Sequence, residues 1–245
     1  MKNIIKSLAV IVVTAAMVSG TTYAFFSDTE TSEGNTFTAG SIDLKIDYKC
    51  EDDLCEVPFK DLNNDQFFGD CDIKPGDKGE VTISWHISDN KAWGRMRMAD
   101  VVNYEYHCTE PEAEVDSTCG PDDPFDPGVG LGELSDFLTF TAWMDEGDVE
   151  GWQCQTDQGG CPDDPTEGDN IFNGAYEVKF AENKSVNEFM EGFELPEVLD
   201  PNHVYYVGLQ WELPSEAGNI VQTDSLMANI VMEAVQYRNN SNPWQ

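Results

Sequence analysis

One twelve-residue segment, residues 61–72, carries oxygen side chains at a spacing suited to a calcium ion. Hard cations take six to eight oxygen ligands. Side chains at loop positions 1, 3 and 5 turn toward one centre, and the carbonyl at position 7 adds another oxygen. Gln66 stands where the sharp turn prefers Gly, and the last ligand is Asp where a longer Glu is usual. Acidic loops also produce this spacing by chance, so a calcium site and an ordinary loop both stay open. The predicted ligands are Asp61, Asn63, Asp65, Phe67 and Asp72.

The seven cysteines form the second group with chemical potential. No two of them are spaced as Cys-x-x-Cys, which weakens a zinc interpretation and favours disulfides in an oxidising compartment. Short separations within Pro/Gly/Asp-rich stretches favour Cys108–Cys119 and Cys154–Cys161 as pairs. Three cysteines then remain for one further disulfide, and the one left unpaired is either a free thiol or forms an intermolecular bond. These three are Cys50, Cys55 and Cys71.

Motifs for catalysis are scarce. His86, His107 and His203 are far apart in the sequence, and there is no His-Glu-x-x-His, Gly-x-Ser-x-Gly or glycine-rich phosphate loop. His86 lies between Trp85 and Ile87 and is expected to face solvent from a strand. We therefore predict no catalytic residue.

The charge balance excludes one class of partner. The 245 residues contain 47 Asp and Glu against 13 Lys and Arg, a net charge of −34. Nucleic-acid binding needs Lys and Arg to neutralise phosphates, so we expect no nucleic-acid partner. Residues 98–178 contain no Lys or Arg at all. Such a stretch is either a solvated surface that keeps the protein soluble or a low-affinity binder of Ca²⁺ or other cations.

The N-terminus has the features of a secretory signal peptide. Lys2 and Lys6 precede an apolar run from Leu8 to Val18, and small residues at positions 22 and 24 suit cleavage between Ala24 and Phe25. The alternative is an uncleaved anchor, but the run is too short to cross about 30 Å of hydrocarbon unaided. We expect residues 1–24 to be removed by a signal peptidase and the mature protein to be secreted, with no stable membrane span.

Alternation of apolar and polar residues predicts an all-β, jelly-roll-like antiparallel sandwich with long acidic, disulfide-stapled loops. A short helix is expected within Asn183–Phe193, with Val186, Phe189 and Met190 facing inward. The predicted domain covers residues 41–238, with acidic insertions near 108–131 and 147–170 and a tail at 239–245. The predicted strands lie at residues 41–47, 80–88, 138–144, 175–180, 204–211 and 225–237.

Both ends of the mature chain resemble the TasA/camelysin family of secreted biofilm-matrix proteins. The resemblance rests on Ala-Phe-Phe-Ser-Asp-Thr-Glu from residue 24 and on Asn-Thr-Phe-Thr-Ala-Gly-Ser-Ile-Asp-Leu at 35–44. Further matching pieces are Ile-Lys-Pro-Gly-Asp at 73–77, the strand that follows it, and the closing strand at 224–237. The acidic, cysteine-bearing middle of the chain does not match.

This resemblance implies a fibre or pilus subunit of the extracellular matrix or cell surface, which polymerises with itself head to tail. In this family, the mature N-terminal segment of one subunit completes a sheet of the next, so residues 25–40 are the expected donor strand. Its large side chains are Phe25, Phe26 and Phe37. The resemblance also leaves open a camelysin-like metalloendopeptidase. A monomeric calcium-dependent adhesin, which needs no donor strand, is a third reading.

Overall fold

The protein is described from a computed structural model. The described residues are 27–30, 42–50, 57–60, 68, 73–120, 128–147, 165–166, 168–174, 177–201 and 203–245, with backbone alone at 27–30, 47–50 and 57–60.

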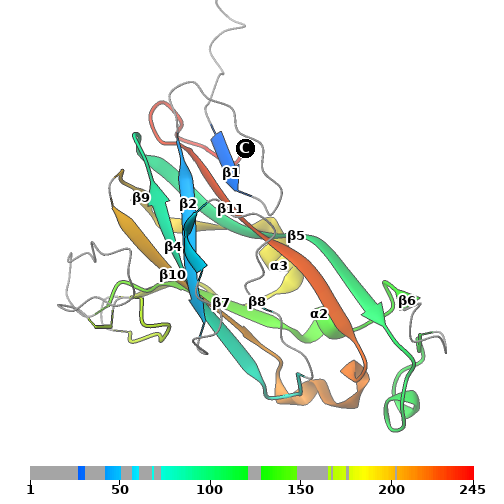
Figure 1. The fold of residues 1–245 in the computed structure, drawn as a ribbon. Helices are drawn as coiled ribbons and strands as arrows, with labels where there is room; N and C mark the ends of the chain where they lie inside the picture. The colour runs from blue at the N-terminus through cyan, green and yellow to red at the C-terminus, as the bar shows by residue number, and fades with distance from the viewer. Residues whose placement is uncertain are drawn as a thin grey trace, which may run out of the picture.

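Two antiparallel sheets build the molecule (Figure 1). The first has the order β1-β11-β5-β6, and β9 also pairs with β5. Its strands are β1 Ser27–Glu30, β5 Ala92–Glu105, β6 Gly128–Val129, β9 Phe193–Leu199 and β11 Ser225–Gln236. The second has the order β3-β2-β4-β10-β7-β8. Its strands are β2 Leu44–Cys50, β3 Val57–Lys60, β4 Lys78–Ile87, β7 Thr139–Met144, β8 Val178–Ser185 and β10 Val204–Glu212.

A single apolar core holds the two sheets together. Trp85 and Leu209 from the second sheet and Met96 and Met232 from the first are buried in the same cluster. Trp85 and Met96 have polar or charged neighbours on both sides along their strands, so β4 and β5 turn one row of side chains toward the other sheet. The predicted all-β antiparallel fold is thus confirmed, and the six predicted strands correspond to β2, β4, β7, β8, β10 and β11.

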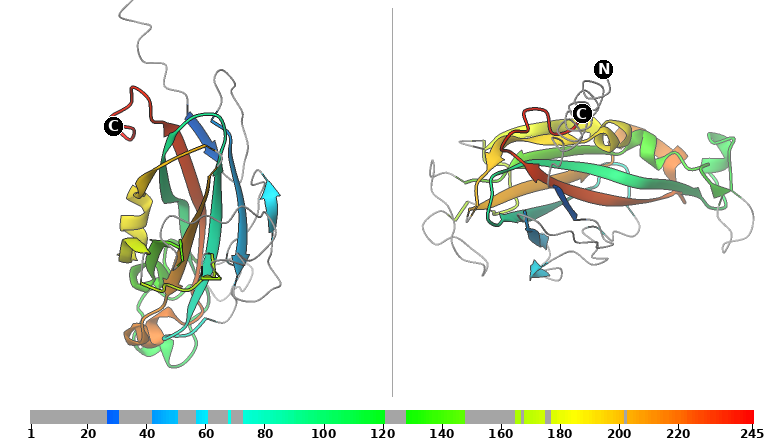
Figure 2. Two further views of the ribbon diagram at one scale, coloured as in Figure 1. Left: turned by 90° about the vertical axis from the view of Figure 1, so that its left-hand side faces the viewer. Right: turned by 90° about the horizontal axis from the view of Figure 1, so that it is seen from above.

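Short helices close the ends and one side of the sandwich. Among the described residues, the α-helices are α2 Leu134–Phe137 and α3 Val186–Glu191, and the 3₁₀ helices are η1 Glu112–Glu114 and η2 Ser215–Val221. Helix α3 contacts β7 and β8 of one sheet and β5 of the other. Figure 2 (left) shows it on the opposite side of the strands from β2 and β3.

Helix α3 lies within the predicted helical segment at 183–193 and is shorter than that segment. Ser185 and Glu188 form a capping box that starts α3, and Gly192 at φ 91° ends it in a conformation that favours glycine. Val186 and Phe189 are buried as predicted, but the prediction for Met190 was wrong, because its side chain is 42% exposed.

Strand β4 departs from simple alternation. Its polar residues Thr82 and Ser84 are as buried as the apolar ones. Thr82 Oγ1 donates a hydrogen bond of 2.7 Å to Asp145 Oδ2, so the segment after β7 covers this face. His86 is half-buried and its Nε2 lies 2.8 Å from Ser84 Oγ, so the histidine expected to face solvent is only partly exposed.

Residues 239–245, expected to be a tail, pack back on the first sheet. Trp93 Nε1 donates a hydrogen bond of 2.8 Å to the carbonyl of Asn240. The guanidinium of Arg95 lies 4.3 Å from the ring centroid of Trp244. These contacts anchor the C-terminal segment beside β5.

Candidate functional site: an edge strand and a buried carboxylate cluster

The N-terminal strand β1 lies at the edge of the first sheet (Figure 1). It pairs antiparallel with the end of β11, from Ser27 opposite Val235 to Glu30 opposite Met232. An edge strand is held by main-chain hydrogen bonds to a single neighbour, so another copy of the same segment can replace it. The predicted donor segment therefore contains a strand, and that strand pairs within its own chain. Phe25, Phe26 and Phe37 lie outside the described residues.

The β11 residues next to β1 are firmly placed. Met232 and Ala234 are buried completely in the core. On the other face, Glu233 accepts hydrogen bonds from Arg95 and Arg97, with Arg95 Nε at 2.7 Å and Arg97 Nε at 3.2 Å. Partly buried charge-assisted pairs of this kind fix geometry, so β11 presents a rigid edge to β1.

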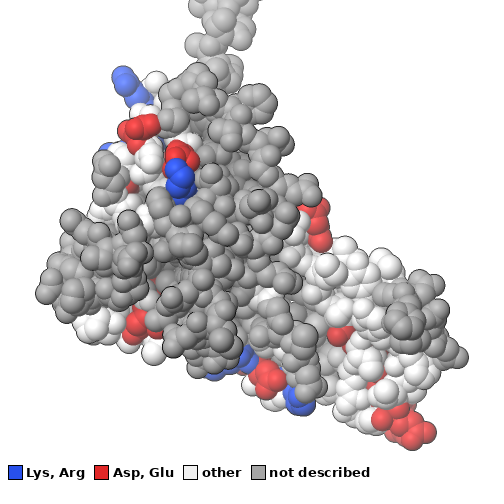
Figure 3. Space-filling model, in the orientation of Figure 1, with Lys and Arg blue, Asp and Glu red and all other residues white. Residues whose placement is uncertain are grey.

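The second feature is a cluster of four carboxylates at the far end of the first sheet. Pairing of Ser225 with Tyr104 brings the start of β11 to the end of β5, which sets Asp224 beside Glu105. Glu112 opens η1, and Glu133 is the N-cap residue of α2. On the face in Figure 3, acidic side chains lie over the end that carries β6, with no Lys or Arg visible there.

Glu105 and Glu112 are fully buried. Thr223 Oγ1 lies 3.2 Å from Glu105 Oε1 and 3.1 Å from Glu112 Oε2, within donating distance of both. The backbone N–H of Thr109 also donates to Glu112 Oε2, at 3.2 Å. One oxygen of each carboxylate is therefore held in place.

Glu133 and Asp224 are half-buried and held in the same way. Thr118 Oγ1 donates to Glu133 Oε1 at 2.8 Å. The N–H groups of Glu133 and Leu134 donate to Asp224 Oδ2 at 2.7 and 2.9 Å, so Asp224 caps the start of α2.

The second oxygen of each carboxylate receives no hydrogen bond from a hydroxyl, amide or N–H group in the described part of the chain. Glu105 and Asp224 hydrogen-bond to each other, which requires a proton on one of the two. Burial is the main reason that the pKa of Glu105 is raised to about 9, and the hydrogen bond and charge of Asp224 and the charge of Glu112 contribute to the same value. Burial is also the main reason that the pKa values of Glu112, Glu133 and Asp224 are raised. These unpartnered atoms are Glu105 Oε2, Glu112 Oε1, Glu133 Oε2 and Asp224 Oδ1.

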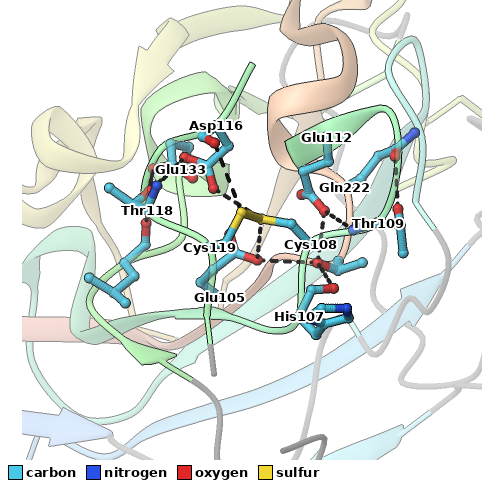
Figure 4. Close-up of a disulfide and its surroundings, with 12 residues drawn as sticks. Glu105, His107, Cys108, Thr109, Glu112, Asp116, Thr118, Cys119, Glu133 and Gln222 are labelled. Carbon is cyan, nitrogen blue, oxygen red and sulfur yellow. Dashed lines mark hydrogen bonds between the residues drawn. A yellow bond between two sulfur atoms is a disulfide. The ribbon is translucent and has the colours of Figure 1, made fainter. Parts of the chain in front are cut away.

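A disulfide borders this cluster (Figure 4). Cys108 and Cys119 are bonded, with 5.2 Å between their Cα atoms, which confirms the predicted pair. Cys108 Sγ lies 3.3 Å from Asp116 Oδ2. A disulfide sulfur carries no proton and is not a thiolate, so neither cysteine is a metal ligand in this state. The bond ties the segment after β5 to the segment that positions Thr118.

Asp145, just after β7, is a buried carboxylate away from the cluster. Its Oδ2 accepts hydrogen bonds from Thr82 Oγ1 at 2.7 Å and from the N–H of Asn170 at 3.2 Å. Its Oδ1 has no partner among the described residues. Burial is the main reason that the pKa of Asp145 is raised to about 8, and the charge of Glu177 contributes to that value.

Several predicted residues lie outside the described part of the chain. The predicted calcium ligands at 61–72 lie outside the described residues. The cleavage site at Ala24 and Phe25 and the predicted pair Cys154–Cys161 also lie outside them. Cys55 and Cys71 are there too, and only the backbone of Cys50 is described. Sequence reasoning did not single out the four clustered carboxylates. The one sequence signal is the stretch 98–178 without Lys or Arg, which includes Glu105, Glu112 and Glu133 but not Asp224.

Residues 1–80 match the model of a family described as camelysin metallo-endopeptidase. The match covers the N-terminal resemblance and extends into β4. No curated protein matches the chain. Among the described residues, no helix has the length and apolar character needed to span a membrane.

The family description implies a metal, and a catalytic zinc site usually has three His or acidic ligands with one open position. In the described residues, the groups whose side chains approach closely enough to hold a metal contain Cys, Asp and Glu but no His. All three histidines lie within the described residues. Cys108 and Cys119 are bonded to each other. The described residues do not fit a peptidase zinc centre. The group of Glu105, Glu133 and Asp224 offers only oxygen ligands and suits a hard cation.

Proposed function

We propose that the mature protein is a secreted structural subunit that polymerises into extracellular fibres or pili by exchanging β1 between neighbouring chains. The observation that carries this proposal is the pairing of β1 with the edge of β11. The N-terminal match to the camelysin family supports the same reading, because residues 1–80 include β1.

Strand exchange would preserve the contact already seen within one chain. The same residues of β1 would pair with the same residues of β11, now from the next subunit, so the main-chain hydrogen bonds per subunit stay equal in number. Residues 31–41 connect β1 to the described start of the domain, and eleven extended residues reach at most about 40 Å. A head-to-tail contact of this kind does not close on itself, so it propagates a filament.

A camelysin-like metalloendopeptidase is the second candidate, favoured by the printed description of the matched family. It would need metal ligands other than the histidine-free groups among the described residues. Protease assays with and without chelator on repurified protein decide between the two functions.

Deletion of residues 25–34 tests the proposed function. The chain that begins at residue 25 should form filaments in negative-stain micrographs. The chain that begins at residue 35 should stay monomeric, because it has no β1 to donate. Circular dichroism serves as the folding control. Filaments of the same morphology from both chains would refute strand exchange.

A further inference from the structure

Four buried or half-buried carboxylates converge without a counter-charge in the described part of the chain. The larger charge effects on Glu105 come from Asp224 and Glu112, and both are repulsive. Residues 98–178 contain no Lys or Arg that could neutralise them. Burial of an unpaired carboxylate is costly unless a proton or a cation compensates its charge.

The unpartnered oxygens distinguish this cluster from ordinary surface acidity. Glu105 and Asp224 share a side-chain hydrogen bond, which requires a proton on one of them and for which a cation can substitute. Glu105 and Glu112 have no exposed surface, yet Glu105 Oε2 and Glu112 Oε1 receive no hydrogen bond from any other donor group among the described residues. The other oxygen of each is occupied by Thr223 or by a backbone N–H. Each carboxylate is thus oriented by one oxygen while the second is left available for a ligand.

The distances suit a cation of calcium size. One oxygen each from Glu105, Glu133 and Asp224 lies within 4.8 Å of the others. Ligands on opposite sides of Ca²⁺ are about 4.6–5.2 Å apart, because Ca–O distances are about 2.3–2.6 Å, whereas Mg²⁺ draws its ligands to about 4.2 Å. The donor set is all oxygen, which favours a hard cation over zinc or copper.

We propose that Glu105, Glu133 and Asp224 bind one calcium ion, with Glu112 beside Glu105 as a further oxygen donor. Water and backbone carbonyls complete the coordination that Ca²⁺ requires. This site uses no residue of the segment 61–72 and does not depend on the proposed polymerisation.

The ion would join four segments at one end of the sandwich. Glu105 ends β5, Glu112 opens η1, Glu133 precedes α2 and Asp224 precedes β11. Calcium would replace the mutual repulsion of these carboxylates with attraction to the ion. A cation that binds the folded chain but not the unfolded chain stabilises the fold by mass action.

Calorimetric titration of the EGTA-treated mature protein with CaCl₂ tests the site. We expect one binding event well above the weak background of surface carboxylates. The Glu105→Gln/Glu133→Gln variant should lose at least tenfold in affinity for that event. The matched Glu110→Gln/Glu114→Gln variant removes two exposed charges from the segment that carries Glu112 and should bind as tightly as the unmodified chain. Equal calcium binding by all three chains, or absence of the tight event from the unmodified chain, would overturn the proposal.

A second measurement on the unmodified protein guards against misfolding of the variant. In hydrogen exchange followed by mass spectrometry, Ca²⁺ should slow exchange in peptides that cover residues 103–112, 130–137 and 221–227. Protection confined to residues 61–72, or absent from all of these peptides, would place the ion elsewhere and refute the site.

Discussion

A chain that carries Asp28→Pro and Thr29→Pro should remain monomeric under conditions in which the unmodified mature chain forms filaments. Successive N–H groups of a strand point to opposite sides, so two consecutive prolines remove at least one N–H that pairs with β11. Because β1 has four residues and pairs by hydrogen bonds with β11 alone among the described strands, this loss should abolish pairing. Light scattering and negative-stain microscopy report the result.

The matched control is Asp28→Ala/Thr29→Ala, which removes the same side chains and keeps both N–H groups. This variant should still assemble, since the proposed contact is made by the main chain. The fold of the monomer should be unchanged in both variants, because β1 is a short strand at the edge of the first sheet. Filaments from the proline variant at the rate of the alanine variant would contradict the strand-exchange mechanism.

Asp145→Asn should make the protein more stable at pH 8 and flatten the pH dependence of its stability. The pKa of Asp145 is about 8 in the folded protein against an ordinary 3.8, because the carboxylate is buried. The folded state therefore binds the proton more tightly than the unfolded state. The resulting stabilisation is complete below about pH 3.8 and is lost as the pH rises toward 8, at up to about 1.4 kcal/mol per pH unit.

Urea unfolding in EGTA between pH 5 and pH 8 measures this effect. The Asn variant keeps an oxygen that accepts from Thr82 and cannot ionise, so it should lose less stability over this range than the unmodified chain. Asp136→Asn, an exposed Asp on α2, should follow the unmodified chain. If Asp145→Asn shows the same slope as the unmodified chain, Asp145 is not the residue that titrates in this window.

The strands were predictable because alternation is a local signal. Burial of Ile83 and Trp85 in β4 follows directly from their spacing. Strand β9 was not predicted: Pro196 interrupts its pattern, and it is accommodated because β9 pairs with β5 alone. The burial of Thr82 depended on a loop from residues far along the chain, which no local pattern reveals.

The candidate site was predictable in part. The Cys108–Cys119 pair was accessible because its short loop limits the partners. The carboxylate cluster was not, because Glu105, Glu133 and Asp224 meet only through the pairing of β5 with β11 and the capping of α2. Among 47 acidic residues, no spacing rule separates these from solvated ones.

Strand exchange is tested most directly by asking whether a covalent link forms between β1 of one chain and β11 of another. Thr29 lies opposite Glu233, so a Thr29→Cys chain mixed with a Glu233→Cys chain should give a 29–233 disulfide between chains, identified by mass spectrometry. A single chain that carries both substitutions is the positive control, since its monomer should form the link internally. We expect the interchain link in assembled filaments. Filaments from the mixture without that link, alongside an efficient internal link in the control, would contradict strand exchange.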